Sequence, residues 1–423
     1  MTSTPESTLK VSAWVGIDWA DKEHALSLQA EGSSQVERTT LIQEPEALQN
    51  WIVQLRTRFA GAQVAVALEQ SRGPLLYALM GTDFLVLYPI NPKTLAKYRE
   101  ALYPSGAKDD PNDADLLRDL IQKHAQRLHA WLPEDPPTRQ LRLAVEYRRN
   151  LVDEQTELTN QLTSHLKNYF PQALNWVGNL DSVQACDFLE RWPSLEVLQK
   201  TAPGKIEKFY RLHHCHPPQL IEERLQQIKK AKPLTLDPAL LQTITVLVHS
   251  KVRQLRIVME SIQEFNGQIK NLFAQHPDHD LFDSFPGAGP ALGPRLLSAF
   301  GTDRHHFKDA GEIQKLSGIA PITKRSGQMK VVQMRLACPH FLKQTFHEYA
   351  GQSVLRSTWA KQYYELKKSQ NMKHHAILRE IAYRWMRIMF RCWQNHTPYE
   401  EQKYLNALQK RHRPLETLNS QSV

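Results

Sequence analysis

The stretch from Val11 to Ala30 constrains the fold more than any other, because it predicts a strand, a tight polar turn and a second strand. The first strand is apolar around Trp14, Val15 and Ile17, and it ends at Asp18. A buried charge without a partner is strongly destabilising. Asp18 therefore needs either a basic side chain or a divalent metal that it shares with other carboxylates. The simpler alternative is that Asp18 only ends the strand and begins the turn.

The segments that follow predict an α/β domain. Apolar residues recur at helical spacing over Thr39–Phe59, and the apolar run Gln63–Leu68 is typical of a buried central strand, which ends at Glu69. A helix over Leu75–Met80 and a strand over Phe84–Tyr88 come next. This order of elements predicts a mixed sheet, with the second acid at a strand end like the first.

Two further acids lie in the segment GAKDDPNDADLLRDLI, Gly106–Ile121. Asp110, which a proline follows, is a good N-cap, and Asp113 lies three residues later on the same side of the helix start. Capping and the helix dipole would explain both acids without any function. With Asp18 and Glu69, however, they form a set of four carboxylates from two strands and a helix start. Hard oxygen ligands of this kind suit one or two Mg²⁺ ions, which support phosphoryl transfer.

The Pro-rich segment Trp131–Thr138 predicts a domain boundary, beyond which the chain looks helical. Apolar residues alternate by four and three over Val248–Phe273, with the polar Asn266 in the same register. Such helices predict an antiparallel hairpin, an intermolecular coiled coil or an ordinary helical core. We expect three domains, namely a catalytic domain over 1–130, a helical or coiled-coil linker and oligomerisation region over 131–280, and a C-terminal domain over 281–423.

The C-terminal third is strongly basic. Residues 301–423 hold 21 Lys and Arg against 9 Asp and Glu, a net charge of +12, while the whole chain carries +9. This asymmetry predicts a polyanionic partner, most simply nucleic acid, although a charged stretch can also be a solvated surface. Arg379, Arg384 and Arg387 lie in a helical stretch with apolar residues between them, and we expect them to contact phosphates.

A glycine-rich turn, Pro286–Gly289, separates two apolar helical segments and is similar to a helix-hairpin-helix. In such a turn Gly287 and Gly289 would let backbone N–H groups approach a phosphate. The alternative is a tight turn between helices that binds no ligand.

Ser326 lies in a short predicted turn between Lys324 and Gly327, where Lys324 and Arg325 place two cations beside it. A serine next to a glycine in a loop is usually only part of the turn. By itself this position is therefore a weak candidate for a nucleophile.

The composition argues against a membrane protein. Hydrophobic residues make up 41% and charged residues 23% of the chain, and no run approaches the roughly 18 apolar residues that a membrane span needs. The N-terminus, MTSTPESTLK, lacks the basic-then-apolar pattern of a signal peptide. The four cysteines lie far apart and form no paired spacing, which predicts a reduced, cytoplasmic setting.

Together, these segments resemble one known family almost from end to end. WVGIDWADKEH (14–24), VALEQSRGPLL (66–76) and AKDDPNDADLL (107–117) resemble its three acid segments. FPGAGPALGPRLLSAFG (285–301) and LSGIAPITKRSG (316–327) resemble its serine domain. The chain is thus similar to the insertion-sequence transposases with a DEDD catalytic domain and a C-terminal serine domain, which a bridge RNA guides.

The resemblance implies an RNase H-like (RuvC-like) N-terminal domain, a helical or coiled-coil middle and a mostly α-helical C-terminal domain. The acids that correspond to the catalytic, metal-binding set are Asp18, Glu69, Asp110 and Asp113. Ser326 corresponds to the catalytic serine. Asp110 keeps the family's spacing to Asp113, whereas Asp109 stands where the family typically has threonine, so the choice of third acid lies between these neighbours.

The implied function is that of an RNA-guided DNA transposase or recombinase, which cuts and rejoins donor and target DNA through a Mg²⁺-dependent phosphoserine intermediate. We expect a homo-oligomer, a dimer or tetramer, in the bacterial cytoplasm and associated with the nucleoid. One alternative is a RuvC-like, metal-dependent structure-specific endonuclease that uses water, with Ser326 as a mere turn residue. The other is a non-catalytic nucleic-acid-binding regulator whose acids are caps and strand ends.

Overall fold

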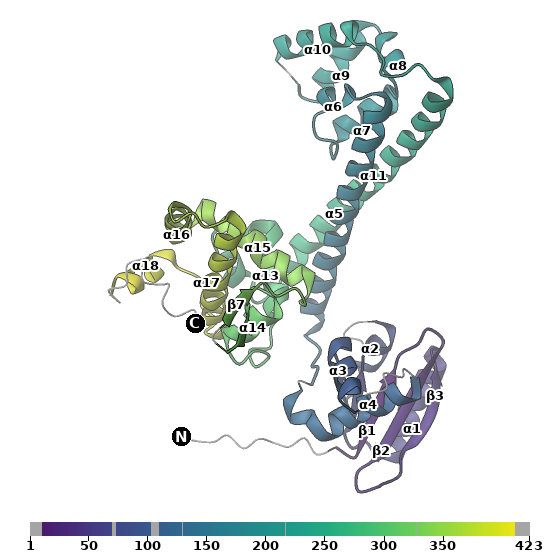
Figure 1. The fold of residues 1–423 in the computed structure, drawn as a ribbon, viewed down its shortest axis with the longest axis vertical. Coiled ribbons are helices and arrows are strands. Elements are labelled where there is room, and N and C mark those ends of the chain that lie inside the picture. The colour runs from purple at the N-terminus through teal and green to yellow at the C-terminus, as the bar shows by residue number, and fades with distance from the viewer. Residues whose placement is uncertain are drawn as a thin grey trace. The chain divides into compact units, whose positions relative to one another are not determined.

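The computed structural model describes residues 11–69, 73–102, 110–128, 130–215, 217–327 and 329–410. The chain divides into two compact units, Met1–Pro133 and Glu134–Val423 (Figure 1). No helix within the described ranges is long and apolar enough to cross a membrane. The four cysteines all carry free thiols, in agreement with their unpaired spacing.

A five-stranded mixed sheet forms the first unit, so the predicted α/β domain with a mixed sheet is confirmed. Its strands are β1 (Ala13–Asp18), β2 (Glu23–Ala30), β3 (Glu37–Ile42), β4 (Val64–Leu68) and β5 (Leu85–Pro89). They lie in the order β3-β2-β1-β4-β5. The strand β2 is antiparallel to both its neighbours, whereas β1, β4 and β5 are parallel to one another. Every residue of β4 is buried, as its continuous apolar sequence requires.

The prediction of a helix over Thr39–Phe59 is wrong for the first part of this range. Residues Glu37–Ile42 form β3, which pairs with β2 at the edge of the sheet, and α1 (Pro45–Arg58) begins only afterwards. Leu41 is the one buried residue of this strand, because the rest of the edge faces solvent. A proline at the first helical position then starts α1.

Helices cover both faces of the sheet. They are α1, α2 (Pro74–Leu79), α3 (Pro92–Leu102) and α4 (Asp110–His124). On one face, Val15 packs in a cluster with Leu55 of α1 and Leu75 of α2. On the other face, Ala67 packs in a separate cluster with Leu117 of α4. Alternate residues of β1 and β4 therefore face α4, which decides where the strand-end acids point.

The second unit contains two long helices, α5 (Pro136–Tyr169) and α11 (Pro238–Ala274), which pack against each other (Figure 1). Leu141 near the start of α5 shares a cluster with Phe273 near the end of α11. Leu166 near the end of α5 shares another cluster with Val248. The helices are therefore antiparallel within one chain, and the apolar spacing seen in the sequence faces this contact.

A small helical group closes the far end of this pair (Figure 1). Its members are α6 (Ala173–Trp176), α7 (Val183–Arg191), α8 (Leu195–Gln199), α9 (Pro203–Leu212) and α10 (Pro218–Lys230). Along the pair, Arg148 donates a hydrogen bond to the side-chain oxygen of Asn266. The one polar residue in the apolar register of α11 thus has a specific partner on α5.

The remaining helices surround an aromatic core. They are α12 (His279–Asp283), α13 (Gly289–Phe300), α14 (Ala310–Leu316), α15 (His340–Arg356), α16 (Thr358–Ser369), α17 (His374–Gln394) and α18 (Glu401–Lys410). Trp385 and Trp393 are completely buried, and their indole N–H groups donate to the hydroxyl of Ser353 and the carbonyl of Gly301. Each large apolar ring thereby also satisfies its polar atom.

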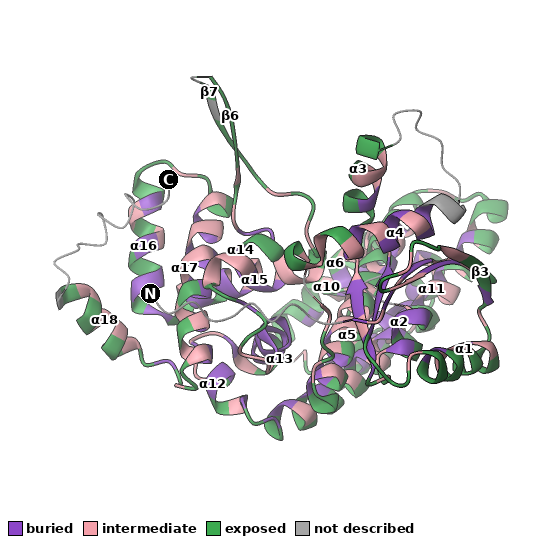
Figure 2. Ribbon diagram, turned by 90° about the horizontal axis from the view of Figure 1, so that it is seen from below, coloured by how far each residue is buried: buried purple, intermediate pink, exposed green. Residues whose placement is uncertain are grey.

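An antiparallel hairpin of β6 (Ile322–Ser326) and β7 (Met329–Gln333) extends away from these helices (Figure 2). The turn expected over Lys324–Gly327 is therefore displaced. Lys324, Arg325 and Ser326 are paired strand residues, and the turn itself begins at Gly327, whose φ of 55° favours glycine.

Candidate catalytic carboxylates and nucleic-acid interface

Asp18 and Glu69 lie at the same edge of the sheet. The strands β1 and β4 are parallel neighbours with Ile17 opposite Leu68, and the two acids are the residues that follow this pair. Both acids are partly exposed, in contrast to the fully buried apolar residues before them. Two carboxylates distant in sequence thus end neighbouring strands in register.

Gly16 shows which face of the sheet these acids share. A Cβ at Gly16 would lie 2.0 Å from the carbonyl oxygen of Ala114 and 2.6 Å from the amide nitrogen of Arg118, both on α4. The backbone of α4 therefore rests directly on β1 at this position. Side chains alternate along a strand, so Asp18, two residues later, is on the face that α4 covers.

The direction of α4 follows from three hydrogen bonds to β2. The hydroxyl of Ser27 donates to Asp115, while Arg118 donates to Ser27 and also to Gln29. Ser27 is paired with Gly16, and Gln29 is paired with the residue nearer the start of β1. The helix α4 therefore runs in the opposite direction to β1. The start of α4 points to the edge where β1 ends.

This arrangement brings Asp113 into the same region as the strand-end acids. Asp113 is 1% exposed and lies in the first turn of α4. Asp110 opens the helix, but its side chain is outside the described part, as is Asp109 altogether. Three predicted acids, Asp18, Glu69 and Asp113, thus come from two strand ends and one helix start on one face of the sheet.

Arg99 of α3 is the partner of Asp113. Its guanidinium donates to both carboxylate oxygens, at 2.8 Å from Nε to Oδ1, and the Asp113 side chain is 2% exposed. A two-pronged contact of this kind is the strongest form of charge-assisted hydrogen bond. Arg99 is not among the residues predicted from the sequence. The requirement that a buried acid has a partner predicts a cation here, but nothing in the local spacing identifies which one.

The donor chemistry fits a divalent cation. Within the described ranges, no group of three or more His, Cys, Asp or Glu side chains is placed to hold a metal ion. Asp18 and Glu69 nevertheless present hard carboxylate oxygens at a partly exposed edge, and such ligands suit a divalent cation that keeps several waters. The ion pair with Arg99 engages both carboxylate oxygens of Asp113, so a metal ion at Asp113 would compete with Arg99 for these oxygens.

Ser326 is the last paired residue of β6 and is exposed. Its neighbours Lys324 and Arg325 are exposed as well. Side chains alternate along β6, so Ser326 and Lys324 share one face of the hairpin and Arg325 occupies the other. The predicted serine is thus accessible, with one cation on its own face.

The two glycines of the predicted helix-hairpin-helix turn have different surroundings. A Cβ at Gly287, whose φ is 86°, would lie 3.0 Å from the backbone of Gln352 on α15. Gly287 is therefore needed for close packing between the turn and α15. Gly289 has a φ of 52° and nothing within 4 Å of such a Cβ, so its side is open at the start of α13.

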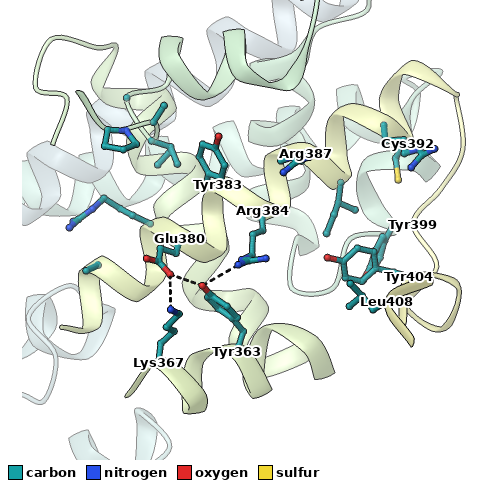
Figure 3. Close-up of a pocket in the computed structure, with 18 of the residues that line it drawn as sticks. Tyr363, Lys367, Glu380, Tyr383, Arg384, Arg387, Cys392, Tyr399, Tyr404 and Leu408 are labelled. Carbon is teal, nitrogen blue, oxygen red and sulfur yellow. Dashed lines mark hydrogen bonds and ion pairs between the residues drawn. The ribbon is translucent and has the colours of Figure 1, made fainter. Parts of the chain in front are cut away.

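The predicted arginines of α17 line a large cavity of about 1720 Å³, together with residues of α18 and the base of the hairpin (Figure 3). Arg387 is exposed and Arg379 is partly exposed. Arg384 instead lies 4.3 Å from the ring centre of Tyr363 and donates to its hydroxyl at 3.3 Å. Burial, reinforced by Glu380, raises the pKa of Tyr363 to about 12. The cavity is also lined by cations outside the predicted set, among them Arg391 and Lys403.

Comparison with known proteins gives the family. A model of DEDD transposases of the IS110 type matches residues 15–171, and a model described as the transposase IS116/IS110/IS902 family matches residues 279–365. The mini-circle putative transposase for IS117 of Streptomyces coelicolor is 26% identical over 402 residues, which cover 93% of this chain and 96% of that protein. An uncharacterised protein of insertion element IS116 from Streptomyces clavuligerus is 22% identical over 91% of this chain and 95% of its own length.

These matches confirm the resemblance seen in the sequence. The first matched region contains all four predicted acids, and the second contains the turn with Gly287 and the hairpin with Ser326. A DEDD transposase suggests a divalent metal as cofactor, in agreement with the carboxylates at the sheet edge. The chain belongs to the IS116/IS110/IS902 family of transposases, enzymes that act on DNA by phosphoryl transfer.

Proposed function

We propose that the protein cuts and rejoins DNA strands through a covalent phosphoserine intermediate, with Ser326 as the nucleophile. One observation carries the proposal: Asp18 and Glu69 lie at one sheet edge, toward which the start of α4 points, in a chain of a DNA-acting family. The exposed hydroxyl of Ser326 at the end of β6 supports its role as the attacking group.

The strand order β3-β2-β1-β4-β5, with β2 antiparallel to its neighbours, supports an RNase H-like, RuvC-like assignment of the first unit. The residues that would hold Mg²⁺ are Asp18, Glu69, Asp113 and Asp110, with Asp109 as the alternative to Asp110. When bound there, the metal would favour the ionised hydroxyl and neutralise charge on the phosphate.

The two chemical steps balance without any further reagent. In the first, Ser326 Oγ attacks a phosphodiester phosphorus, the bond from phosphorus to one strand end breaks, and that end leaves as a hydroxyl with the proton that the serine lost. In the second, the hydroxyl of the partner strand attacks the phosphoserine, which restores a phosphodiester and the serine hydroxyl. Lys324, on the same face of the hairpin, would neutralise the approaching phosphate. A serine hydroxyl is a weak nucleophile unless a base or a metal ion activates it.

We further propose that a guide RNA selects the donor and target DNA, and that the protein works as a homodimer or tetramer in the cytoplasm, close to the nucleoid. The basic C-terminal region supports nucleic-acid partners. The acids and Ser326 belong to different units of the chain, which supports a site completed by association of protomers. In this assembly 1–130 is the catalytic domain, 131–280 the linker with α5 and α11 as a coiled coil, and 281–423 the serine domain.

The test is capture of the covalent intermediate. Purified protein is incubated with guide RNA, Mg²⁺ and end-labelled target DNA, and the products are separated under denaturing conditions and mapped by peptide mass spectrometry. The proposal expects a DNA adduct on the peptide that contains Ser326, and none in Ser326→Ala. Cleavage without an adduct in the unmodified protein, or an adduct that persists in Ser326→Ala, would support a water-using nuclease instead.

A further inference from the structure

The cavity beside α17 has the size of a binding groove for a polymer. Its volume of about 1720 Å³ exceeds the range of about 300–1,000 Å³ that is typical of sites for small molecules. Its walls come from α17, α18, the loop around Ile319 and the base of the β6–β7 hairpin. All of these elements belong to the second unit, and Figure 3 shows the α17 and α18 side chains that surround the space.

The groove is lined by more cations than acids. Seven Lys or Arg residues line it, against Glu380 and Glu400. Lys367 pairs with Glu380, and Arg384 stacks on a tyrosine, so these two belong to the floor. The other five make no ion pair within the described part of the chain, and they are Arg325, Arg379, Arg387, Arg391 and Lys403.

Three of these cations follow one line along α17. Positions 379, 383, 387 and 391 are each four residues apart in the sequence. Arginine occupies three of them, and Tyr383 occupies the second. Four residues advance a helix by about 6 Å, so the line presents positive charges along roughly 18 Å of the groove. A row of this kind suits a linear polyanion better than one compact anion.

Aromatic and apolar side chains lie between the cations. The rings of Tyr383 and Tyr404 are partly exposed in the groove, and Figure 3 shows them on α17 and α18. Apolar groups of Ile319, Val332 and Met334 complete the walls. Duplex DNA presents mainly phosphates to a protein surface and keeps its bases stacked inside. Unpaired bases, in contrast, can stack on tyrosine rings while their phosphates meet arginines.

The hairpin separates this groove from the proposed nucleophile. Thr323, Arg325 and Val332 line the groove, and they share one face of the hairpin by strand alternation and pairing. Ser326 and its paired residue Met329 are on the opposite face and do not line it. A strand bound in the groove would therefore lie on the face of the hairpin opposite to Ser326. It would be bound there and not cleaved.

We infer that this groove binds a single-stranded segment of nucleic acid, with Arg387 and Arg391 on its phosphates and Tyr383 and Tyr404 stacked on its bases. The inference rests on the membership of a DNA-acting family, but it does not depend on the phosphoserine chemistry. Single-stranded RNA and single-stranded DNA share the required chemistry, and the experiment distinguishes them.

The test measures binding by the full-length protein. Fluorescence anisotropy is recorded with labelled probes of about 12 nucleotides, a length within the range of single-strand sites, as RNA, as DNA and as duplex DNA. We expect the double substitution Arg387→Gln with Arg391→Gln to weaken single-strand binding at least about tenfold and to flatten the log–log salt dependence by about 1.4. Tyr383→Leu with Tyr404→Leu should weaken it at least about fivefold with the salt slope unchanged.

Two controls make the result specific. Lys229→Gln with Lys230→Gln removes the same charge from exposed residues of α10 and should leave single-strand affinity within about twofold. Ser326→Ala should bind as the unmodified protein does, so a failure of the serine mechanism leaves this result intact. Arg387 and Arg391 are exposed, and a thermal melt should show that their replacement keeps the fold.

Selective loss of RNA binding or of DNA binding would each support the inference and identify the strand. The inference is overturned if the arginine variant binds single strands normally. It is also overturned if the tyrosine variant keeps its affinity while both arginine and control variants lose single-strand and duplex binding equally, because the groove would then be part of a general cationic surface.

Discussion

The acids and the serine are held in opposite ways. Asp18, Glu69 and Asp113 come from the ends of packed elements, next to strands whose apolar residues are fully buried. Ser326 is exposed at the end of a two-stranded hairpin that no third strand extends within the described residues. Hairpins of two strands are only marginally stable by themselves. The packed fold thus fixes the backbone positions of the three acids, whereas the exposed hairpin that carries Ser326 has fewer contacts to fix it.

This contrast predicts how the two regions respond to substitution. At the sheet edge, we expect a substitution to disturb the packing that positions the acids, because α4 rests on the backbone of β1 at Gly16. On the hairpin, we expect a substitution of the exposed Ser326 to leave the fold intact. Substitutions in the two regions should therefore differ in their effects on activity and on stability.

Loss of either strand-end acid should have the largest effect. We expect Asp18→Asn or Glu69→Gln to reduce strand exchange on the order of a thousandfold or more, with DNA and RNA binding nearly unchanged. Asp21→Asn, at an exposed acid in the following turn, is the matched control and should keep full activity. The double variant should be no worse than either single one. Strand exchange is measured by gel assay. If the loss in the double variant equals the product of the two single losses, the acids act separately.

Gly16→Ala should disrupt the first unit. The added methyl group overlaps the carbonyl of Ala114, so we expect a loss of about 3 kcal/mol or more in local stability. Hydrogen exchange of peptides from β1 and α4 measures it. Gly267→Ala on α11, where a Cβ has open space, should instead stabilise its helix by about 0.5–1 kcal/mol. Normal protection of α4 in Gly16→Ala would show that the helix can shift without cost.

Arg99→Gln should make the first unit depend on a divalent cation. Breaking a buried ion pair leaves Asp113 without its partner and should cost about 3 kcal/mol in metal-free protein. Added Mg²⁺ should recover more of the thermal stability in Arg99→Gln than in the unmodified protein, because Asp113 is then available as a ligand. Equal stabilisation of both proteins by Mg²⁺ would place Asp113 outside the metal site.

Ser326→Ala should have the smallest effect on stability, less than about 0.5 kcal/mol, because the hydroxyl is exposed at the end of β6. Chemical denaturation and hydrogen exchange over β6 and β7 measure it. A large loss of protection would mean that the serine holds the hairpin together, and the loss of activity in this variant would then have a structural cause.

Much of this architecture follows from local patterns in the sequence. The apolar run Gln63–Leu68 predicts a buried central strand, and the two strand ends place Asp18 as the last residue of β1 and Glu69 directly after β4. The four-and-three spacing over Val248–Phe273 predicts one side of the long helix pair. These features depend on residue order within one element, which the sequence contains completely.

Other features depend on contacts between distant elements. Leu41 and Ile42 fit a helical spacing, but pairing with β2 makes Glu37–Ile42 a strand. The sequence predicts that Ser326 lies in a turn, but it lies in strand β6, because Met329–Gln333 forms the antiparallel strand that pairs with it.

The sequence by itself determined the order of the four acids and the basic C-terminal region, because residue type and position contain that information, whereas only the resemblance to the transposase family singled out Ser326. The tertiary structure alone decided that Arg99 holds Asp113, that Arg384 lies on Tyr363, and that Arg387 faces a groove. The partner of a charged side chain depends on which elements pack beside it. That packing is a long-range property of the fold, to which no local pattern of residues corresponds.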